Sequence, residues 1–200
     1  MAANTESANS STAQAPATAP AESPQAPAEA TRAPAVRLRP ARTQDVTAIQ
    51  EIVEPLANER ILLQKEKVAY YEAIQEFLVA EAEDGQIVGF GAVHVMWDDI
   101  AEIRTLAVSP VVKGAGVGHR LLDALVARAR DLGVSRLFCL TFEVDFFTAH
   151  GFAVMADQSA VDPGVYAELL RSRDEGVAEF LDLARVKPNT LGNTRMILTL

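Results

Sequence analysis

VSPVVKGAGVGHRLLDALVARA, residues 108–129, places three glycines two positions apart directly before an amphipathic helical pattern. A glycine lets the backbone approach a ligand closely, and the amides at the start of a helix point at an anion with help from the helix dipole. Lys113, His119 and Arg120 add positive charge around this loop. The stretch therefore predicts a binding site for a phosphate-bearing ligand.

Four interpretations compete for the glycine loop. A P-loop for nucleoside triphosphates requires Gly-Lys-Ser/Thr, but Gly118 is followed by His119. A dinucleotide-binding fold requires G-x-G-x-x-G directly after a buried strand, whereas the spacing here is G-x-G-x-G and Pro110 separates the strand from the loop. A loop that merely turns the chain is the third interpretation. The remaining interpretation is a site for the pyrophosphate of coenzyme A.

The composition excludes several classes of protein. A net charge of −9 over 200 residues argues against nucleic-acid binding, which normally requires a basic face. The single cysteine, Cys139, excludes an intrachain disulfide framework and a Cys-based zinc site, and no His/Asp/Glu cluster has the spacing of metal ligands. The sequence has no apolar run as long as a membrane span and no secretory signal. We therefore expect a cytoplasmic protein with no membrane partner.

The chain divides into a tail and one folded domain. Residues 1–35 are mostly Ala, Pro, Ser and Thr with almost no large apolar side chain, which predicts a disordered tail. Residues 36–200 form the domain. Its hydrophobic periodicity predicts strands at 36–40, 77–83, 86–97, 101–108, 135–142, 152–155 and 194–200, and helices at 43–58, 66–77, 119–132, 145–150 and in part of 161–183.

Turn and cap residues refine this reading. We expect Thr43 to cap the first helix and Pro55 to kink or end it. Gly89 and Gly91 indicate a bulge in the strand that contains them. The three strands between 77 and 108 form an antiparallel meander. The order of elements predicts an α/β (α+β) fold, with a mixed, mostly antiparallel sheet and helices on both faces.

The stretch AEIRTLAVSPVVKGAGVGHRLLDALV, residues 101–126, resembles the central signature of the GNAT superfamily of N-acyltransferases. The resemblance implies that the loop binds the pyrophosphate of acetyl-CoA, with Lys113 where relatives carry Gln or Arg. It also implies that the strand end before the loop splays from its neighbour and bonds the pantetheine arm. The cofactor-binding residues expected on this basis are Leu106, Ala107, Val108, Lys113, Gly114, Ala115, Gly116, Val117 and Gly118. His119 is added to them because of the positive charge it can carry beside the loop.

A narrower resemblance runs through HVMWDDIAEIRTLAVSP (94–110), FEVDFFTAHGF (142–152) and LLQKE (62–66). These stretches are similar to the amino-acid N-acetyltransferases that make N-acetylglutamate for arginine biosynthesis. ARVKPNTLGNTRMILTL (184–200) resembles the C-terminus of their short, single-domain actinobacterial members. The resemblance implies acetyl transfer from acetyl-CoA to the α-amine of L-glutamate, the first step of arginine biosynthesis, by direct attack in a ternary complex.

Glu102 is the candidate general base, because an α-ammonium must lose a proton before it attacks a thioester. Side chains alternate along a strand, so we expect Glu102, Arg104 and Leu106 to share one face. The alternative for Glu102 is an ion-paired strand carboxylate, with Arg104 as its partner. The Tyr that many superfamily members use as general acid is replaced here by Phe147, so no acid is assigned.

A substrate with two carboxylates requires fixed cations, and arginine is preferred for two-pronged bonding. The candidate substrate-binding residues are Arg104, Lys65 and Arg195, with Lys187 a further cation. Glutamine, a protein N-terminus and a polyamine are alternative acceptors, and a non-catalytic acyl-CoA sensor is the alternative outside enzymes. Members of this fold often dimerise, which makes a homodimer a further hypothesis.

Overall fold

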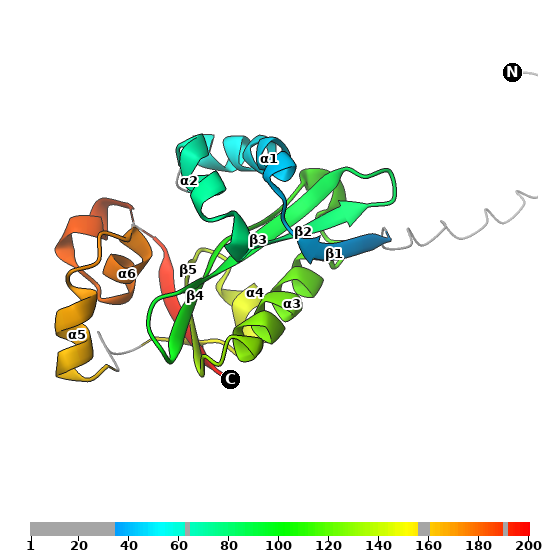
Figure 1. The fold of residues 1–200 in the computed structure, drawn as a ribbon. Coiled ribbons are helices and arrows are strands. Elements are labelled where there is room, and N and C mark those ends of the chain that lie inside the picture. The colour runs from blue at the N-terminus through cyan, green and yellow to red at the C-terminus, as the bar shows by residue number, and fades with distance from the viewer. Residues whose placement is uncertain (1–34, 63–64, 156–160, 190–191) are drawn as a thin grey trace, which may run out of the picture. The chain divides into compact units, whose positions relative to one another are not determined.

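The computed structural model describes residues 35–62, 65–155, 161–189 and 192–200. The predicted tail therefore lies outside the described residues, apart from Ala35. The described chain builds a seven-stranded sheet with the order β1-β2-β3-β4-β5-β7-β6 (Figure 1). Its strands are β1 (Val36–Pro40), β2 (Phe77–Ala82), β3 (Ile87–Val95), β4 (Ile100–Val108), β5 (Arg136–Thr141), β6 (Ala153–Val154) and β7 (Thr194–Thr199).

The sheet is mixed and mostly antiparallel, as the sequence predicts. Strands β1 to β4 form an antiparallel series, and β7 runs antiparallel to both β5 and β6. Strand β4 pairs with β5 in parallel, over three residue pairs that end at Glu102 and Phe138. Beyond this point β4 and β5 separate, so none of the described strands pairs with this edge of the second half of β4.

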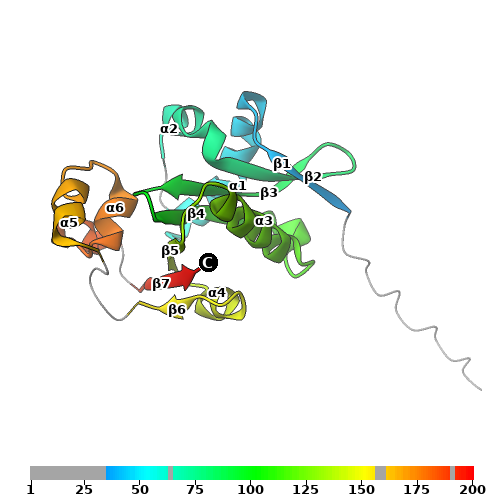
Figure 2. The ribbon, with the colours of Figure 1, turned by 60° about the horizontal axis from the view of Figure 1, so that its bottom comes forward.

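Helices cover both faces of the sheet (Figure 2). Their described bounds are α1 (Val46–Asn58), α2 (Lys67–Glu72), α3 (Val117–Asp131), α4 (Val144–Ala149), α5 (Pro163–Leu169) and α6 (Glu175–Phe180), with 3-10 turns at Thr43–Asp45, Ile74–Glu76, Pro110–Val112 and Ala184–Asn189. Helices α1 and α2 pack on the face that carries Val79 and Phe90. On the same face further along, α5 and α6 pack around Phe138.

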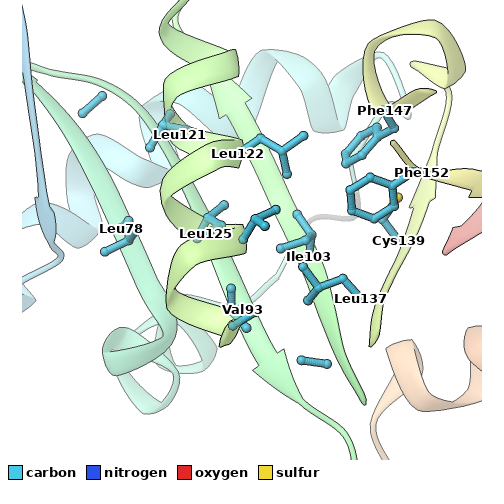
Figure 3. Packing of buried hydrophobic residues seen from close by; sticks show 14 of the residues in the cluster. Leu78, Val93, Ile103, Leu121, Leu122, Leu125, Leu137, Cys139, Phe147 and Phe152 are labelled. Carbon is cyan, nitrogen blue, oxygen red and sulfur yellow. The ribbon is translucent and has the colours of Figure 1, made fainter. Parts of the chain in front are cut away.

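Helix α3 packs on the opposite face and forms the main core. Figure 3 shows Leu121, Leu122 and Leu125 pointing at the sheet. All three are fully buried, as the apolar face of the predicted helix requires. Gly91 admits this close approach, because a Cβ there would lie 2.7 Å from a methyl carbon of Leu125. Cys139 is buried in the same cluster, where it packs as a small apolar residue.

A bulge interrupts the pairing of β3 with β4. Phe90 lies opposite Ala107 and Ala92 lies opposite Arg104, so β4 contains one more residue than β3 in this interval. The extra residue is accommodated at Thr105, whose φ of 56° lies in the left-handed region. This bulge lies beside Gly91, with its extra residue in the partner strand β4. The predicted bulge in β3 itself is also present, because Ala80 lies opposite Gly89 while Glu81 lies opposite Ile87, which leaves Val88 as the extra residue beside Gly89.

The bulge corrects one expectation about the faces of β4. Glu102 and Arg104 share a face, as predicted, and their side chains are hydrogen-bonded. Leu106 does not share it, because the extra residue shifts the alternation by one position. Leu106 instead packs in the α3 core, while Ala107 joins the cluster under α1 and α2.

Two further expectations in the first helical region need correction. Of the two effects expected of Pro55, an end to the helix does not occur, because α1 continues through this residue to the predicted end at Asn58. The hydrogen bond that this proline removes would have used the carbonyl of Glu51, an exposed residue that water reaches. Thr43 makes no side-chain cap. The buried carboxylate of Asp45 accepts the Arg42 N–H at 2.7 Å instead.

The predicted helix 66–77 is also shorter than expected. It divides into α2 and a 3-10 turn, and Phe77 already belongs to β2. Phe77 is buried against the rings of Tyr70 and Phe90. Packing of this ring therefore overrides the helical periodicity at the end of the segment.

Candidate active site

A cavity of about 320 Å³ lies on the Glu102 face of β4, between the α1–α2 connection and α6. The sheet provides its floor, because Glu102 and Arg104 point toward it from the strand. Its described lining comprises Arg60, Ile61, Leu62, Lys65, Ala69, Glu102, Ile103, Arg104, Thr105, Leu140, Arg173, Asp174, Glu175, Gly176, Glu179 and Asn193. Chain segments far apart in sequence thus build one charged pocket of the size of a small metabolite.

Arg104 connects the two walls of this pocket. Its Nε and Nη2 donate to Oε2 of Glu102 at 3.0 and 2.6 Å. Its Nη1 and Nη2 also donate to the two carboxylate oxygens of Asp174 at 3.1 and 2.9 Å. Burial alone would raise the pKa of the Asp174 carboxyl, but the hydrogen bond and charge of Arg104 hold it below its ordinary value. The guanidinium thus fixes both carboxylates.

Gly176 makes the contact between α6 and this ion pair. A Cβ at Gly176 would lie 1.9 Å from Oε2 of Glu102 and 2.8 Å from Nη2 of Arg104. No side chain fits in that space, so glycine is required here for close approach. The helix is held by Asp174, whose Oδ1 caps it by accepting the Val177 N–H at 3.1 Å.

Glu179 is the second buried carboxylate of the pocket. Only 8% of this residue is exposed, and no side-chain hydrogen bond joins it to any other residue that the structure describes. Burial raises the pKa of the Glu179 carboxyl to about 7, and the negative charges of Glu102 and Glu175 add to this effect. Arg104 and Lys65 act in the opposite direction but do not cancel it.

The cations predicted to hold a substrate lie in different places. Lys65 and Arg104 line the pocket, as expected. Arg195 is not among its described lining, and its Nη2 donates to the carbonyl of Phe180 at the end of α6. Lys187 lies in the 3-10 turn Ala184–Asn189, and its side chain is outside the part of the chain that the structure describes. Arg60 and Arg173 line the pocket without having been predicted.

His94 lies beside the pocket on β3. Its Nδ1 is 2.8 Å from Oε1 of Glu76, and its Nε2 is 3.7 Å from Oδ2 of Asp174. The histidine therefore links the 3-10 turn Ile74–Glu76 with Asp174, the residue that caps α6. This geometry fits a structural role at the wall of the pocket.

The expected cofactor groove begins where β4 leaves β5. Leu106, Ala107 and Val108 continue the strand after Thr105, and Ala107 and Val108 pair with Phe90 and Gly89 of β3 on one side. On the other side, parallel pairing stops at Glu102. An extended ligand can bond such an unpaired edge as a strand would.

The glycine loop follows this edge and leads into α3. Gly114 and Gly116 have φ values of 80° and 78°, and a Cβ at either position would meet nothing within 4 Å. Their requirement for glycine is therefore conformational. The first bond of the helix runs from Arg120 N to Gly116 O at 3.1 Å. The amides before Arg120 have no partner within the helix and favour an anion.

A chain of three side chains flanks the start of α3. Nδ1 of His119 is 2.7 Å from Nε2 of His150, and Nδ1 of His150 is 3.1 Å from Oδ1 of Asp123. His150 therefore contacts side chains on α3 as well as ending α4. This arrangement holds His119 beside the glycine loop.

Among the residues that the structure describes, no group of three or more His, Cys, Asp or Glu side chains is arranged to hold a metal ion. None of the described helices is long and apolar enough to cross a membrane.

Comparison with known proteins gives consistent matches. The model of the acetyltransferase (GNAT) family matches residues 46–153. An amino-acid acetyltransferase from Mycobacterium tuberculosis is 53% identical over 165 residues, which are 82% of this chain and 94% of that protein. An amino-acid acetyltransferase from Neisseria meningitidis serogroup A is 34% identical over 61% of this chain, but the match spans only 28% of its own length.

Solved structures agree with these matches. The crystal structure of Rv2747 from Mycobacterium tuberculosis, in complex with CoA and NLQ, superimposes with a TM-score of 0.78 at 52% identity and covers 82% of this chain and 99% of that one. N-acetylglutamate synthase from Neisseria gonorrhoeae, complexed with coenzyme A and N-acetyl-glutamate, superimposes with a TM-score of 0.66 at 26% identity. That match covers 82% of this chain and 35% of the synthase.

Proposed function

Because this chain belongs to the GNAT family of acetyltransferases, we propose that it transfers the acetyl group of acetyl-CoA to the α-amine of L-glutamate. One observation carries the choice of a small amino-acid acceptor. The pocket beside the free edge of β4 is small, and it contains buried carboxylates for an amine as well as cations for carboxylates. A long protein acceptor would require an open groove at this position.

The cofactor half of the proposal uses the groove and the glycine loop. Leu106, Ala107 and Val108 bond the pantetheine arm along the free edge of β4. The pyrophosphate binds at the start of α3, where amides without helical partners and a positive helix end favour an anion. The loop residues involved are Lys113, Gly114, Ala115, Gly116, Val117, Gly118 and His119. The thioester then lies next to the bulge at Thr105 and opens into the acceptor pocket.

The acceptor half uses the charged side chains of the pocket. Lys65 binds a substrate carboxylate, since no salt bridge joins it to another described residue. Arg104 fixes Glu102 and Asp174, and Arg195 supports α6 through the Phe180 carbonyl. Glu102 accepts a proton from the acceptor nitrogen, directly or through water, while the amine attacks the thioester in a ternary complex.

Glutamine is the second candidate acceptor, and the charge of the pocket favours it. Among the described residues, four carboxylates line the cavity together with four cations, so this part of the lining has no surplus of positive charge. The carboxylates are Glu102, Asp174, Glu175 and Glu179, and the cations are Arg60, Lys65, Arg104 and Arg173. A neutral amide side chain suits such a balanced pocket, whereas glutamate brings one more negative charge.

The test measures thiol release from acetyl-CoA with each of the twenty amino acids and several polyamines. We expect turnover with glutamate or glutamine alone. The Lys65→Gln variant should raise KM for the acceptor at least tenfold and leave KM for acetyl-CoA unchanged. Lys67→Gln is the matched control, because Lys67 is exposed and lies outside the pocket. Tight acetyl-CoA binding without turnover of any amino acid would contradict the proposal and favour a sensor or a protein acceptor.

Cellular location, assembly and pathway are also proposals. The proposed location is the cytoplasm, where acetyl-CoA and free amino acids are both available. The proposed pathway is arginine biosynthesis, because N-acetylglutamate is the first intermediate that the narrower resemblance implies for it. The proposed assembly is a homodimer. Light scattering of the purified protein tests the homodimer.

A further inference from the structure

We propose that Glu179 is a second catalytic carboxylate, which takes the first proton from the ammonium of the acceptor while Glu102 takes the second from the same nitrogen. This inference rests on the proposed function, because it assigns a further role within the acceptor pocket. Sequence patterns gave no indication of it. Glu179 lies on α6, 77 positions after Glu102, and the fold brings both to one cavity.

Glu179 differs from the other carboxylates of the pocket. Glu102 and Asp174 both accept hydrogen bonds from Arg104. Glu175 is exposed. Glu179 alone among these four is buried and has no side-chain hydrogen bond to a described residue. A buried carboxylate without a partner is costly unless it is protonated or meets a ligand. Its oxygens are therefore available to the ammonium of a bound amino acid.

The surroundings of Glu179 suit it to exchange a proton near neutral pH. Glu102 and Arg104 face it from β4, Glu175 from its own helix and Lys65 from the α1–α2 connection. Burial, Glu102 and Glu175 raise the pKa of its carboxyl to about 7. A general base is most effective when its pKa lies near the working pH. Glu102 is less free to move, because Arg104 donates two hydrogen bonds to one of its oxygens.

The reaction supplies two protons for two carboxylates. An α-ammonium first loses one proton to Glu179, and the resulting amine attacks the thioester carbonyl. The tetrahedral adduct carries a protonated nitrogen, which is a stronger acid than the free ammonium and loses its proton to Glu102. The C–S bond then breaks, and the thiolate takes up one proton to become the CoA thiol. The net products are the N-acetyl amino acid, the CoA thiol and one proton released to water.

The test compares the pH profiles of kcat/KM for wild type, Glu179→Gln and Glu102→Gln at saturating acetyl-CoA. Wild type should lose activity on the acid side with an apparent pKa of about 7. Glu179→Gln should lose about 10²-fold or more in kcat, and its profile should lack this fall in activity on the acid side, the acid limb. In Glu102→Gln the limb should move to lower pH, because the charge of Glu102 raises the pKa of Glu179.

Controls separate this role from the fold and from the proposed function. Glu168→Gln changes an exposed glutamate on the neighbouring helix α5 and should leave the profile unchanged. Circular dichroism and the Kd for acetyl-CoA report whether Glu179→Gln folds. Wild-type turnover of glutamate or glutamine tests the proposed function on its own. If wild type turns over while Glu179→Gln keeps its kcat within threefold or retains the acid limb, Glu179 is not a proton acceptor. A rise in KM alone would assign it to substrate binding and also overturn the inference.

Discussion

Substitution of Gly176 by alanine tests whether the position of Glu102 controls the reaction. The new Cβ would lie 1.9 Å from Oε2 of Glu102, whereas ordinary contact begins at 3.4 Å. The carboxylate must therefore retreat by about 1.5 Å, or α6 must move away from β4. Either change breaks the 2.6 Å hydrogen bond from Arg104 and displaces the carboxylate from the acceptor nitrogen.

The magnitude of the effect follows from these distances. A misplacement of about 1 Å in an active site costs up to about 10²-fold in rate, so we expect kcat/KM to fall between about 10-fold and 10²-fold. Stability should change less. Overpacking costs about 1–3 kcal/mol, while alanine favours the helix over glycine by about 1 kcal/mol. The free energy of unfolding should therefore drop by no more than about 2 kcal/mol.

A matched control isolates the steric effect. Gly164 holds the same position in α5 that Gly176 holds in α6, two residues after a capping Asp. A Cβ there would lie 3.1 Å from Oδ1 of Asp162, outside the pocket. Gly164→Ala should keep wild-type kcat/KM and change the free energy of unfolding by less than about 1 kcal/mol, because the contact is only slightly short and alanine favours the helix. Steady-state kinetics and urea denaturation measure both variants. A Gly176→Ala enzyme within twofold of wild type would refute the argument that Glu102 must stay where it is.

Other perturbations give equally specific expectations. Arg104→Gln should lower the free energy of unfolding by about 3–5 kcal/mol in urea titrations, because two carboxylates lose their buried partner; Arg171→Gln, in an exposed pair, should cost less than about 1 kcal/mol. Wild type should lose stability relative to Glu179→Gln as pH rises from 4.5 to about 7, because over this range the Glu179 carboxyl is ionised in the unfolded state but still protonated in the folded state. The melting temperature of the variant should therefore rise relative to that of wild type over this range. A melting-temperature difference that stays constant with pH would contradict the buried carboxyl. Cys139 should resist iodoacetamide in the native protein, because burial and the charge of Glu102 raise the pKa of its thiol; rapid labelling would show that the core opens. Gly116→Ala should raise KM for acetyl-CoA alone, since a left-handed conformation costs alanine about 1–2 kcal/mol.

The sequence predicted features that depend on neighbouring residues. Hydrophobic periodicity located the strands and α3 to within a few residues, because each buries one continuous face. The glycine loop was recognisable because φ values near 80° at Gly114 and Gly116 require glycine. The common face of Glu102 and Arg104 followed from the period of two. The same rule failed at Leu106, since the extra residue in β4 lies at Thr105, where no glycine or proline in that strand indicated a bulge.

Features that depend on distant contacts could not be predicted. Asp174 and Glu179 lie in a polar segment for which periodicity gave only partial helix. Their place in the pocket results from α6 packing against β4. Arg195 looked like a substrate cation from its charge, but the fold turns it toward the Phe180 carbonyl. Arg60 and Arg173 are ordinary surface cations in sequence, and only the folding of two connections over β4 brings them together.

The contact between Arg104 and Asp174 spans 70 positions, and this separation orders events during synthesis. The ribosome releases the β4 edge and the glycine loop well before it releases α6. A nascent chain can therefore assemble a site for coenzyme A while the wall that receives the amine is still inside the exit tunnel. Strand β7, translated after β6, must also insert between β5 and β6. We therefore expect acetyl transfer only once the C-terminal segment has been made, and a chain truncated before α6 should bind acetyl-CoA without consuming it.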